Sequence, residues 1–273
     1  MTVMTFTDAK QRFSNRVADY VRYRPGYPPG IVAILRENCG LNSGCVIADI
    51  GSGTGFLSEL FLKNGNRVFG VEPNEAMRLA GEEYLASYDG FTSVAASAEA
   101  TTLADASVEF VAVGQAFHWF DLAAARREFI RILKPNGWTV IVWNERLIHE
   151  SPFLQSYEAL LRKYGTDYAR VNESYPRAEQ MCDFFQSAEY LERSVPNIQQ
   201  LDFAGLAGRL RSSSYVPVEG SKNFGEMMDE LQDIFTANQK NGFVRMEYAT
   251  RIYFGHLHSD SILAPPDSEK ITS

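Results

Sequence analysis

Short apolar runs alternate with amphipathic stretches along the first half of the chain. The runs are rich in Val, Ile and Phe, as in strands that are buried on both faces of a sheet. Between them apolar residues recur at helical spacing, as in 56–62. This alternation predicts an α/β fold with a doubly wound, mostly parallel sheet. The strands are predicted at 46–50, 67–72, 92–96, 108–113 and 138–143.

Beyond Trp143 the pattern changes to longer helical stretches and two alternating segments. Residues 193–203 and 244–254 alternate apolar and polar positions, which predicts two further strands. The helical stretches that flank the first of these strands predict a helical cap over the ligand pocket. They are expected at 152–164, 178–185, 206–210 and 224–235.

The first predicted strand runs directly into three glycines at alternate positions, Gly51, Gly53 and Gly55. Glycine lets the backbone turn sharply and approach a ligand where a Cβ would collide. A strand, a glycine turn and a helix N-terminus together form a binding corner for nucleotide-type ligands. The spacing is G-x-G-x-G rather than the G-x-G-x-x-G of dinucleotide-binding proteins, and the chain has no P-loop pattern.

Asp49 lies two residues before the first of these glycines, so that the turn reads D-x-G-x-G-x-G. This pattern resembles motif I of the class I S-adenosylmethionine (SAM) methyltransferases. The resemblance implies that Asp49, Gly51, Gly53 and Gly55 belong to a SAM site.

Two further segments match this family in the expected order. Glu72 ends the second predicted strand, where an acid can accept hydrogen bonds from a ribose diol. The resemblance implies that Glu72 binds the ribose, that Pro73 belongs to the same site and that Met77 packs on adenine. Ala98 and Glu99 resemble the segment that contacts adenine, through the Glu99 side chain or the Ala98 backbone. A core role for Met77 and a solvated position for Glu72 are the alternatives.

The turn before the fifth predicted strand also resembles the family. Pro135 is expected to end the preceding helix, and Asn136 and Gly137 to supply the turn geometry. In this family the Rossmann-like sheet has seven strands, and its last two pair antiparallel at the edge. Residues 193–203 and 244–254 are assigned to that antiparallel edge.

Aromatic residues and arginines are interleaved ahead of motif I. Residues 20–28 resemble a Y-x-x-x-R-P-x-Y-P segment of the trans-aconitate methyltransferase-like branch. Arg24 can pair with the carboxylate of SAM through its planar fork, and Tyr20 can hydrogen-bond to the same group. Tyr27 is a candidate for the substrate pocket. The alternative is a surface helix whose arginines are solvated.

The loop after the fourth predicted strand, 114–121, resembles the A-x-H-W-F segment of the same branch. Ligands of open α/β sheets bind beyond the carboxyl ends of the strands, so this loop should face the reacting methyl group. Gln115 and Ala116 are expected near the methionine part of SAM. His118 is the candidate general base or carboxylate partner. The alternative is that His118 and Trp119 form a packed pocket wall.

Two further residues are candidates for the acceptor pocket. Arg146 follows the fifth predicted strand at the ligand-facing edge, and Tyr215 lies in the predicted cap. A structural role is the alternative for Arg146.

Composition limits the partners. The 273-residue chain carries a formal net charge of −8, which argues against nucleic-acid binding. It contains no apolar run long enough to span a membrane and no secretory-type start, and its three cysteines have no metal-ligand spacing. We therefore expect a cytoplasmic monomer or homodimer without a metal, a nucleic-acid partner or a membrane partner.

We expect a lid segment at 1–30, a SAM-binding core at 31–146, a cap around the last two strands at 147–257 and a flexible tail at 258–273. The predicted function is methyl transfer from SAM, giving S-adenosylhomocysteine (SAH), to a small-molecule acceptor, such as a carboxylate or another oxygen. The alternatives are a quinone-type C-methyltransferase, an N-methyltransferase, a SAM-binding protein without catalysis and an NAD-binding oxidoreductase.

Overall fold

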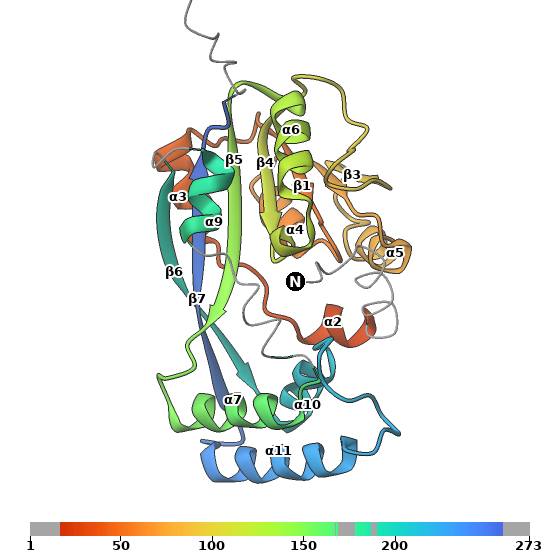
Figure 1. Ribbon diagram of the computed structural model, residues 1–273, viewed down its shortest axis with the longest axis vertical. Helices are drawn as coiled ribbons and strands as arrows, with labels where there is room; N and C mark the ends of the chain where they lie inside the picture. The colour runs from red at the N-terminus through yellow and green to blue at the C-terminus, as the bar shows by residue number, and fades with distance from the viewer. Residues whose placement is uncertain (1–16, 167, 169–177, 187–189, 259–273) are drawn as a thin grey trace, which may run out of the picture.

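The computed structural model describes residues 17–166, 168, 178–186 and 190–258 (Figure 1). Within these residues a seven-stranded sheet has the order β3-β2-β1-β4-β5-β7-β6. The strands β1 to β5 are parallel, and β7 is antiparallel to both β5 and β6. This confirms the predicted parallel sheet with an antiparallel edge. The strands are β1 (Val46–Ile50), β2 (Arg67–Val71), β3 (Phe91–Val94), β4 (Val108–Gly114), β5 (Leu133–Arg146), β6 (Leu191–Leu201) and β7 (Val244–Gly255).

Helices cover both faces of the sheet. Because successive strand residues point to opposite faces, Ile47 packs with α3 and α4, whereas Ala48 packs with α6 and α9. The two apolar layers explain why the central strands read as continuous hydrophobic runs. The helices of this core are α3 (Gly30–Cys39), α4 (Phe56–Lys63), α5 (Glu75–Tyr84), α6 (Leu122–Ile132) and α9 (Ala178–Phe185).

A third apolar cluster forms at the far ends of the long strands β5, β6 and β7. The helices α7 (Pro152–Tyr164), α10 (Phe203–Arg211) and α11 (Phe224–Asn238) pack there, and we call these three helices the cap (Figure 1). The helix α2 (Val17–Tyr23) lies between the cap and the core (Figure 1). Residues 1–16 of the predicted lid segment lie outside the described residues. Residues 259–273 of the predicted tail lie outside them as well.

Several predicted boundaries differ from the observed ones, and two of the differences have a clear physical reason. The helix α6 ends at Ile132, before Pro135, because Leu133 already has extended backbone angles and begins β5. Residue Phe203, predicted in a strand, begins α10 because the Asp202 side chain accepts a hydrogen bond from the Gly205 N–H and caps that helix.

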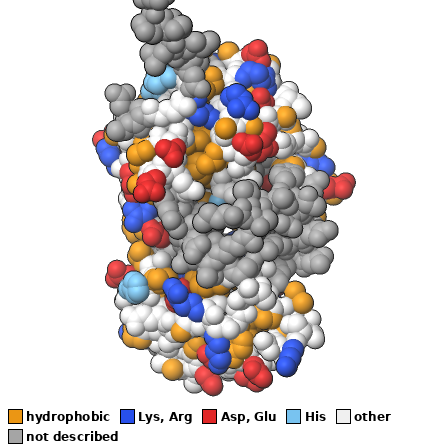
Figure 2. Space-filling model, viewed as in Figure 1, with side chains coloured by type: hydrophobic (Ala, Val, Ile, Leu, Met, Phe, Trp, Pro, Cys, Tyr) orange, Lys and Arg blue, Asp and Glu red, His pale blue; other side chains and the backbone are white. Residues whose placement is uncertain are grey.

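Acidic and basic side chains are interspersed over the described surface on the face shown in Figure 2. None of the helices in the described part of the chain combines the length and the apolar character needed to cross a membrane.

Candidate functional site

The glycine turn connects β1 to α4 at the carboxyl edge of the parallel strands. Gly51 and Gly53 have φ angles of +69° and +57°, a conformation that L side chains rarely adopt. A Cβ at Gly51 would lie 2.6 Å from the Cβ of Ala116, so the loop after β4 packs directly on the turn. Gly53 faces a less crowded space, where a Cβ would meet only Met77 at 3.4 Å. The third glycine, Gly55, precedes the first residue of α4.

Glu72 connects the end of β2 to this turn. Its carboxylate accepts hydrogen bonds from the Gly53 N–H at 2.9 Å and from the Asn74 N–H at 2.7 Å. The side chain is buried and lines a pocket together with Pro73 and Met77. A carboxylate held by two backbone donors has a fixed orientation, which suits recognition of ligand hydroxyls.

This first cavity, which we call the turn pocket, is bordered on its other side by Ala98, Ala116 and Phe120. The predicted partner Glu99 does not line it in the described structure. Its carboxylate accepts a hydrogen bond from the Asp121 N–H, next to the start of α6. Asp121 in turn caps α6 by accepting hydrogen bonds from the Ala123 and Ala124 N–H groups.

A second cavity, which we call the cap pocket, adjoins the first. Tyr20, Gln115 and Trp119 line both pockets, together with the glycine turn. The cap pocket then continues between core and cap, where Arg209 and Tyr215 contribute to its wall. One continuous site therefore extends from the end of β2 to the cap.

Asp49 lies at the core end of the cap pocket and is fully buried. It accepts a hydrogen bond from the Ser58 hydroxyl at 2.6 Å, and its other oxygen has no hydrogen-bond partner among the described residues. Burial raises the pKa of Asp49 to about 7. A cation placed against the open oxygen would therefore gain a strong partner.

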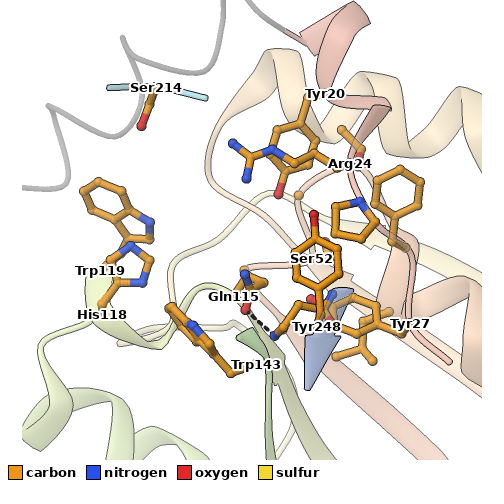
Figure 3. Close-up of a pocket in the computed structure, with 18 of the residues that line it drawn as sticks. Tyr20, Arg24, Tyr27, Ser52, Gln115, His118, Trp119, Trp143, Ser214 and Tyr248 are labelled. Atoms are coloured by element: carbon orange, nitrogen blue, oxygen red, sulfur yellow. Dashed lines mark hydrogen bonds between the residues drawn. The ribbon is translucent and has the colours of Figure 1, made fainter. Parts of the chain in front are cut away.

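Gln115 follows β4 with a φ of +56°, which is unusual for a residue other than glycine. Its side-chain oxygen accepts a hydrogen bond from the Asn144 N–H at 2.9 Å (Figure 3). This bond ties the loop to β5 and holds the turned backbone at the junction of the two pockets.

His118 forms part of an aromatic wall. Its ring lies 4.6 Å from Trp119 and 5.2 Å from Trp143, centroid to centroid (Figure 3). Burial lowers the pKa of His118 to about 4, so the ring is neutral at neutral pH. Its Nδ1 atom has no hydrogen-bond partner among the described residues.

The opposite wall comes from the lid segment. Figure 3 shows Tyr20 and Arg24 across the pocket from Trp119. The Arg24 guanidinium lies 5.0 Å above the Tyr20 ring and donates from Nη2 to the Ser212 carbonyl at 2.9 Å. Tyr27 lines the same pocket, with its hydroxyl packed against Gly114.

Arg146 lines the cap pocket from the end of β5. It forms a buried ion pair with Glu158 of α7 at 2.8 Å and donates to the Tyr168 hydroxyl at 2.6 Å. Tyr215, also in this wall, packs against the Tyr168 ring at 5.0 Å. Arg146 therefore has both of the positions that were predicted as alternatives. It forms a structural ion pair, and it also lines the cap pocket.

Comparison with known proteins places this geometry in a family. A family model described as a methyltransferase domain matches residues 48–141. An uncharacterized methyltransferase of Schizosaccharomyces pombe is 30% identical over 226 residues, which cover 80% of this chain and 86% of the relative. The chain belongs to the class I SAM-dependent methyltransferases.

Solved structures show that this methyltransferase shares its fold with distant relatives. A candidate type II methyltransferase of Anaeromyxobacter dehalogenans superposes with a TM-score of 0.63 at 21% identity, covering 86% of this chain and all (100%) of that one. A phosphoethanolamine N-methyltransferase of Haemonchus contortus, solved with phosphomonomethylethanolamine and SAH, gives 0.55 at 16% identity over 95% of this chain and 61% of that one. The methyltransferase is an enzyme that uses SAM, in contrast to the NAD-binding oxidoreductase considered as an alternative.

Sequence reasoning about the methyltransferase missed several residues that line the cap pocket. Arg209 lies in a helical stretch without a motif, and Tyr248 alternates in a strand like any sheet residue. Trp143 was predicted only as the last residue of the fifth strand, and Asn144 only as the residue that follows it. Their one shared signal is position, because each lies on an element that runs past the carboxyl ends of the parallel strands.

Proposed function

We propose that this methyltransferase transfers the methyl group of SAM to an oxygen of a small acidic molecule held in the cap pocket. The observation that carries the proposal is the excess of buried positive charge there. Arg24 and Arg209 line the cap pocket without a carboxylate partner among the described residues, whereas the charge of Arg146 is balanced by Glu158. The only acidic lining residue among those described is Asp49, at the core end. An anionic acceptor would supply the missing negative charge.

The described residues fit SAM along the turn pocket. Glu72 would hold the ribose hydroxyls, and Met77 and Ala98 would border the adenine. The positive φ angles at Gly51 and Gly53 leave room for close approach of a ligand to the backbone.

The methionine end of SAM would lie at the junction of the two pockets. Its ammonium and sulfonium charges would lie near the open oxygen of Asp49. Its carboxylate would pair with Arg24, whose Nε has no hydrogen-bond partner among the described residues, and with Tyr20. Gln115 and Ala116 would hold this end through the strained loop after β4.

Bound SAM supplies a methyl group on a positively charged sulfur. The acceptor attacks the methyl carbon in line and displaces the sulfur. The protein mainly aligns the two reactants and excludes water, and such alignment can be worth about 7–11 kcal/mol. The walls formed by Tyr20 on one side and Trp119 on the other are placed to do so (Figure 3). A carboxylate oxygen is already nucleophilic, so no base is required.

His118 would contact the acceptor as a neutral group. With a pKa of about 4 it cannot act as a cationic carboxylate partner at neutral pH. We therefore assign His118 and Trp119 to the acceptor wall, with general-base catalysis by His118 as the alternative for an acceptor that must lose a proton.

The resemblance of residues 20–28 and of the loop around His118 supports placement in the trans-aconitate methyltransferase-like branch. N-methyl and quinone-type C-methyl transfer are the competing reactions. The expectation of a cytoplasmic monomer or homodimer stays a prediction.

The acceptor atom can be tested by its product. The protein is incubated with methyl-tritiated SAM and pools of small carboxylic acids, phenols, amines and quinones, and the products are treated with mild alkali. Methyl esters release volatile methanol, whereas phenol ethers, methylamines and C-methyl products do not. Volatile tritium from the acid pool supports the proposal, and alkali-stable label in another pool would replace it with that acceptor class.

A further inference from the structure

The segment between α2 and α3, residues 24–29, is held by side chains of the sheet rather than by strand pairing, and we call it the strap. It belongs to no helix or strand. It contains three residues that have no N–H to donate to a neighbouring strand, Pro25, Pro28 and Pro29. The strap carries Arg24 and Tyr27 into the wall of the cap pocket (Figure 3). Whatever fixes the strap therefore also fixes these two side chains.

Two carboxamides of β6 bind the strap and the residue before it. Asn197 and Gln199 are two positions apart in this strand, so their side chains point to the same face of the sheet. The Gln199 Nε2 atom donates to the Tyr23 carbonyl at 2.9 Å. The Asn197 Nδ2 atom donates to the Gly26 carbonyl, also at 2.9 Å. The two carbonyls flank Arg24 in the chain, so the backbone on both sides of this arginine is tied to β6.

A third carboxamide reaches the strap from β5. The Asn144 Nδ2 atom donates to the Gly26 carbonyl at 3.3 Å. The Asn144 side-chain oxygen accepts hydrogen bonds from the Thr250 hydroxyl at 2.6 Å and from Asn197 Nδ2 at 3.2 Å. Because two donors occupy the oxygen, the nitrogen is the end of the Asn144 side chain that faces the strap. The Asn144 N–H also donates to the Gln115 side chain, so one residue holds both the strap and the loop after β4.

Packing alone does not fix the strap at Gly26. This residue is exposed, and a Cβ there would meet nothing within 4 Å. Asn197 and Gln199 line neither pocket, so any effect they have on a ligand must pass through the strap. A displacement of about 1 Å is enough to misplace a directed hydrogen bond such as one from the Arg24 guanidinium.

We propose that Asn197 and Gln199 are positioning residues for SAM, which hold the strap so that Arg24 meets the carboxylate at the methionine end. They act through the Gly26 and Tyr23 carbonyls and touch neither the cofactor nor the acceptor. The inference rests on the position proposed for SAM, and it assumes nothing about the acceptor.

Two ligands that differ at the methionine end test this role. The purified protein is titrated calorimetrically with SAH and with 5′-methylthioadenosine, which keeps the adenosine and the sulfur but lacks the ammonium and the carboxylate. The wild type should bind SAH more tightly. Gln199→Met keeps the length of the side chain but cannot donate, and it should weaken SAH binding about threefold to tenfold, the range for a neutral hydrogen bond. Its affinity for 5′-methylthioadenosine should not change, which also shows that the variant is folded.

Gln200→Met is the matched control. It makes the same substitution one residue further along β6, where the side chain is exposed and points to the opposite face. Both of its affinities should equal those of the wild type. Equal losses for the two ligands in Gln199→Met would show a general structural role and would overturn the proposal.

Asn197→Asp tests the direction of the hydrogen bond. A carboxylate at this position would face the Gly26 carbonyl and the Asn144 side-chain oxygen without a hydrogen to donate to either. The SAH affinity should therefore fall further in Asn197→Asp than in Asn197→Ala, although both variants lack the donor. An affinity in Asn197→Asp that equals or exceeds that of Asn197→Ala would contradict a donor role for this amide.

Arg24→Met separates this inference from the position proposed for SAM. It should lose most of the preference for SAH over 5′-methylthioadenosine, and adding Gln199→Met should then weaken SAH binding by less than about twofold. An unchanged preference in Arg24→Met would refute the proposed position of SAM and the positioning role together. A lost preference in Arg24→Met, with wild-type SAH affinity in Gln199→Met and Asn197→Ala, would leave the position of SAM standing and refute the role of the two amides.

Discussion

Gly208 of α10 and Tyr23 of α2 are in direct contact, and a Cβ at Gly208 would overlap the tyrosine ring. The same two helices are joined by an ion pair between Arg211 and Asp19 at 3.1 Å. One turn before Tyr23, Tyr20 lines both pockets. The absence of a side chain at Gly208 thus lets α2 pack directly against the cap beside the site.

Replacing this glycine should therefore weaken SAM binding from a distance. We expect Gly208→Ala to displace α2 and to reduce SAH affinity about tenfold or more, as overpacking of a tight contact commonly does. Calorimetric titration measures the effect. Gly225→Ala is the control, since a Cβ there meets nothing within 4 Å. Equal affinities in the two variants would show that docking of α2 on α10 is not needed for binding.

Glu72 should contribute to SAM binding through its charge and its two backbone hydrogen bonds. Glu72→Gln keeps the size but leaves one N–H, of Gly53 or Asn74, without a good acceptor. We expect a loss of SAH affinity of about 10- to 100-fold, the range for a hydrogen bond that involves a charged group. Glu83→Gln, on the exposed side of α5, should have no effect. Unchanged affinity in Glu72→Gln would remove Glu72 from the ribose site.

Alanine variants of Gly51 and Gly40 distinguish the energetic cost of backbone strain from the cost of side-chain crowding. Their φ angles are +69° and +68°, but a Cβ at Gly40 meets nothing within 4 Å. Gly40→Ala should lower the free energy of unfolding by about 1 kcal/mol through strain alone. Gly51→Ala should cost about 1–3 kcal/mol more, because its Cβ collides with Ala116, and should also weaken SAH binding. Urea denaturation measures both losses in the free energy of unfolding. Equal losses would show that the loop after β4 shifts to accommodate the added Cβ at no measurable cost.

Burial of Asp49 should make the SAM-free protein less stable as the pH rises. The pKa of Asp49 is about 7 in the folded state against 3.8 ordinarily, so the folded state holds more protons between these values. The free energy of unfolding then falls with rising pH, by at most about 1.4 kcal/mol per pH unit. Asp49→Asn should remove this slope and stabilise the SAM-free protein at pH 8, while weakening SAM binding. A variant less stable than the wild type at pH 8 would contradict this.

Burial of His118 should make the free energy of unfolding rise with pH, opposite to the effect of Asp49, over nearly the same pH range. Its pKa is about 4 in the folded state against 6.5 ordinarily, so the unfolded state binds more protons below pH 6.5. Its contribution to stability is complete above pH 6.5 and is lost as the pH falls through 4. The difference in melting temperature between wild type and His118→Gln should change over this window and stay constant above pH 7. A constant difference from pH 4 to 8 would show that the ring is solvated.

His118→Gln also tests the acceptor wall. If His118 only contacts the acceptor, turnover should fall while the affinity for SAH stays the same. With a carboxylate acceptor the remaining rate should not depend on pH between 6 and 8. A wild-type rate that rises with pH through about 4 and loses this rise in His118→Gln would instead assign general-base catalysis to the histidine.

The sequence by itself determined the parallel core and the cofactor corner. Strand β1, the glycine turn and the start of α4 are continuous in the chain, so local pattern and backbone sterics suffice to predict them. Glu72 was found in the same way, because it ends the strand that pairs with β1. The antiparallel pair β6 and β7 was assigned through family resemblance and a clear alternating pattern.

The charged lining of the cap pocket was decided only by the tertiary structure. Arg24 donates to the carbonyl of Ser212, 188 residues away, and Arg209 reaches the same cavity from α10. Long-range packing of β5 to β7 and of the cap helices brings these guanidiniums together, and no local pattern in the chain encodes that meeting. The position of Glu99 could not be predicted from the sequence either. Its motif predicted a contact with adenine, whereas in the structure its carboxylate accepts a hydrogen bond from the N–H of Asp121. Short-range sterics and periodicity therefore specify the turn pocket, whereas the charge of the cap pocket arises from side chains that meet only when the chain is folded.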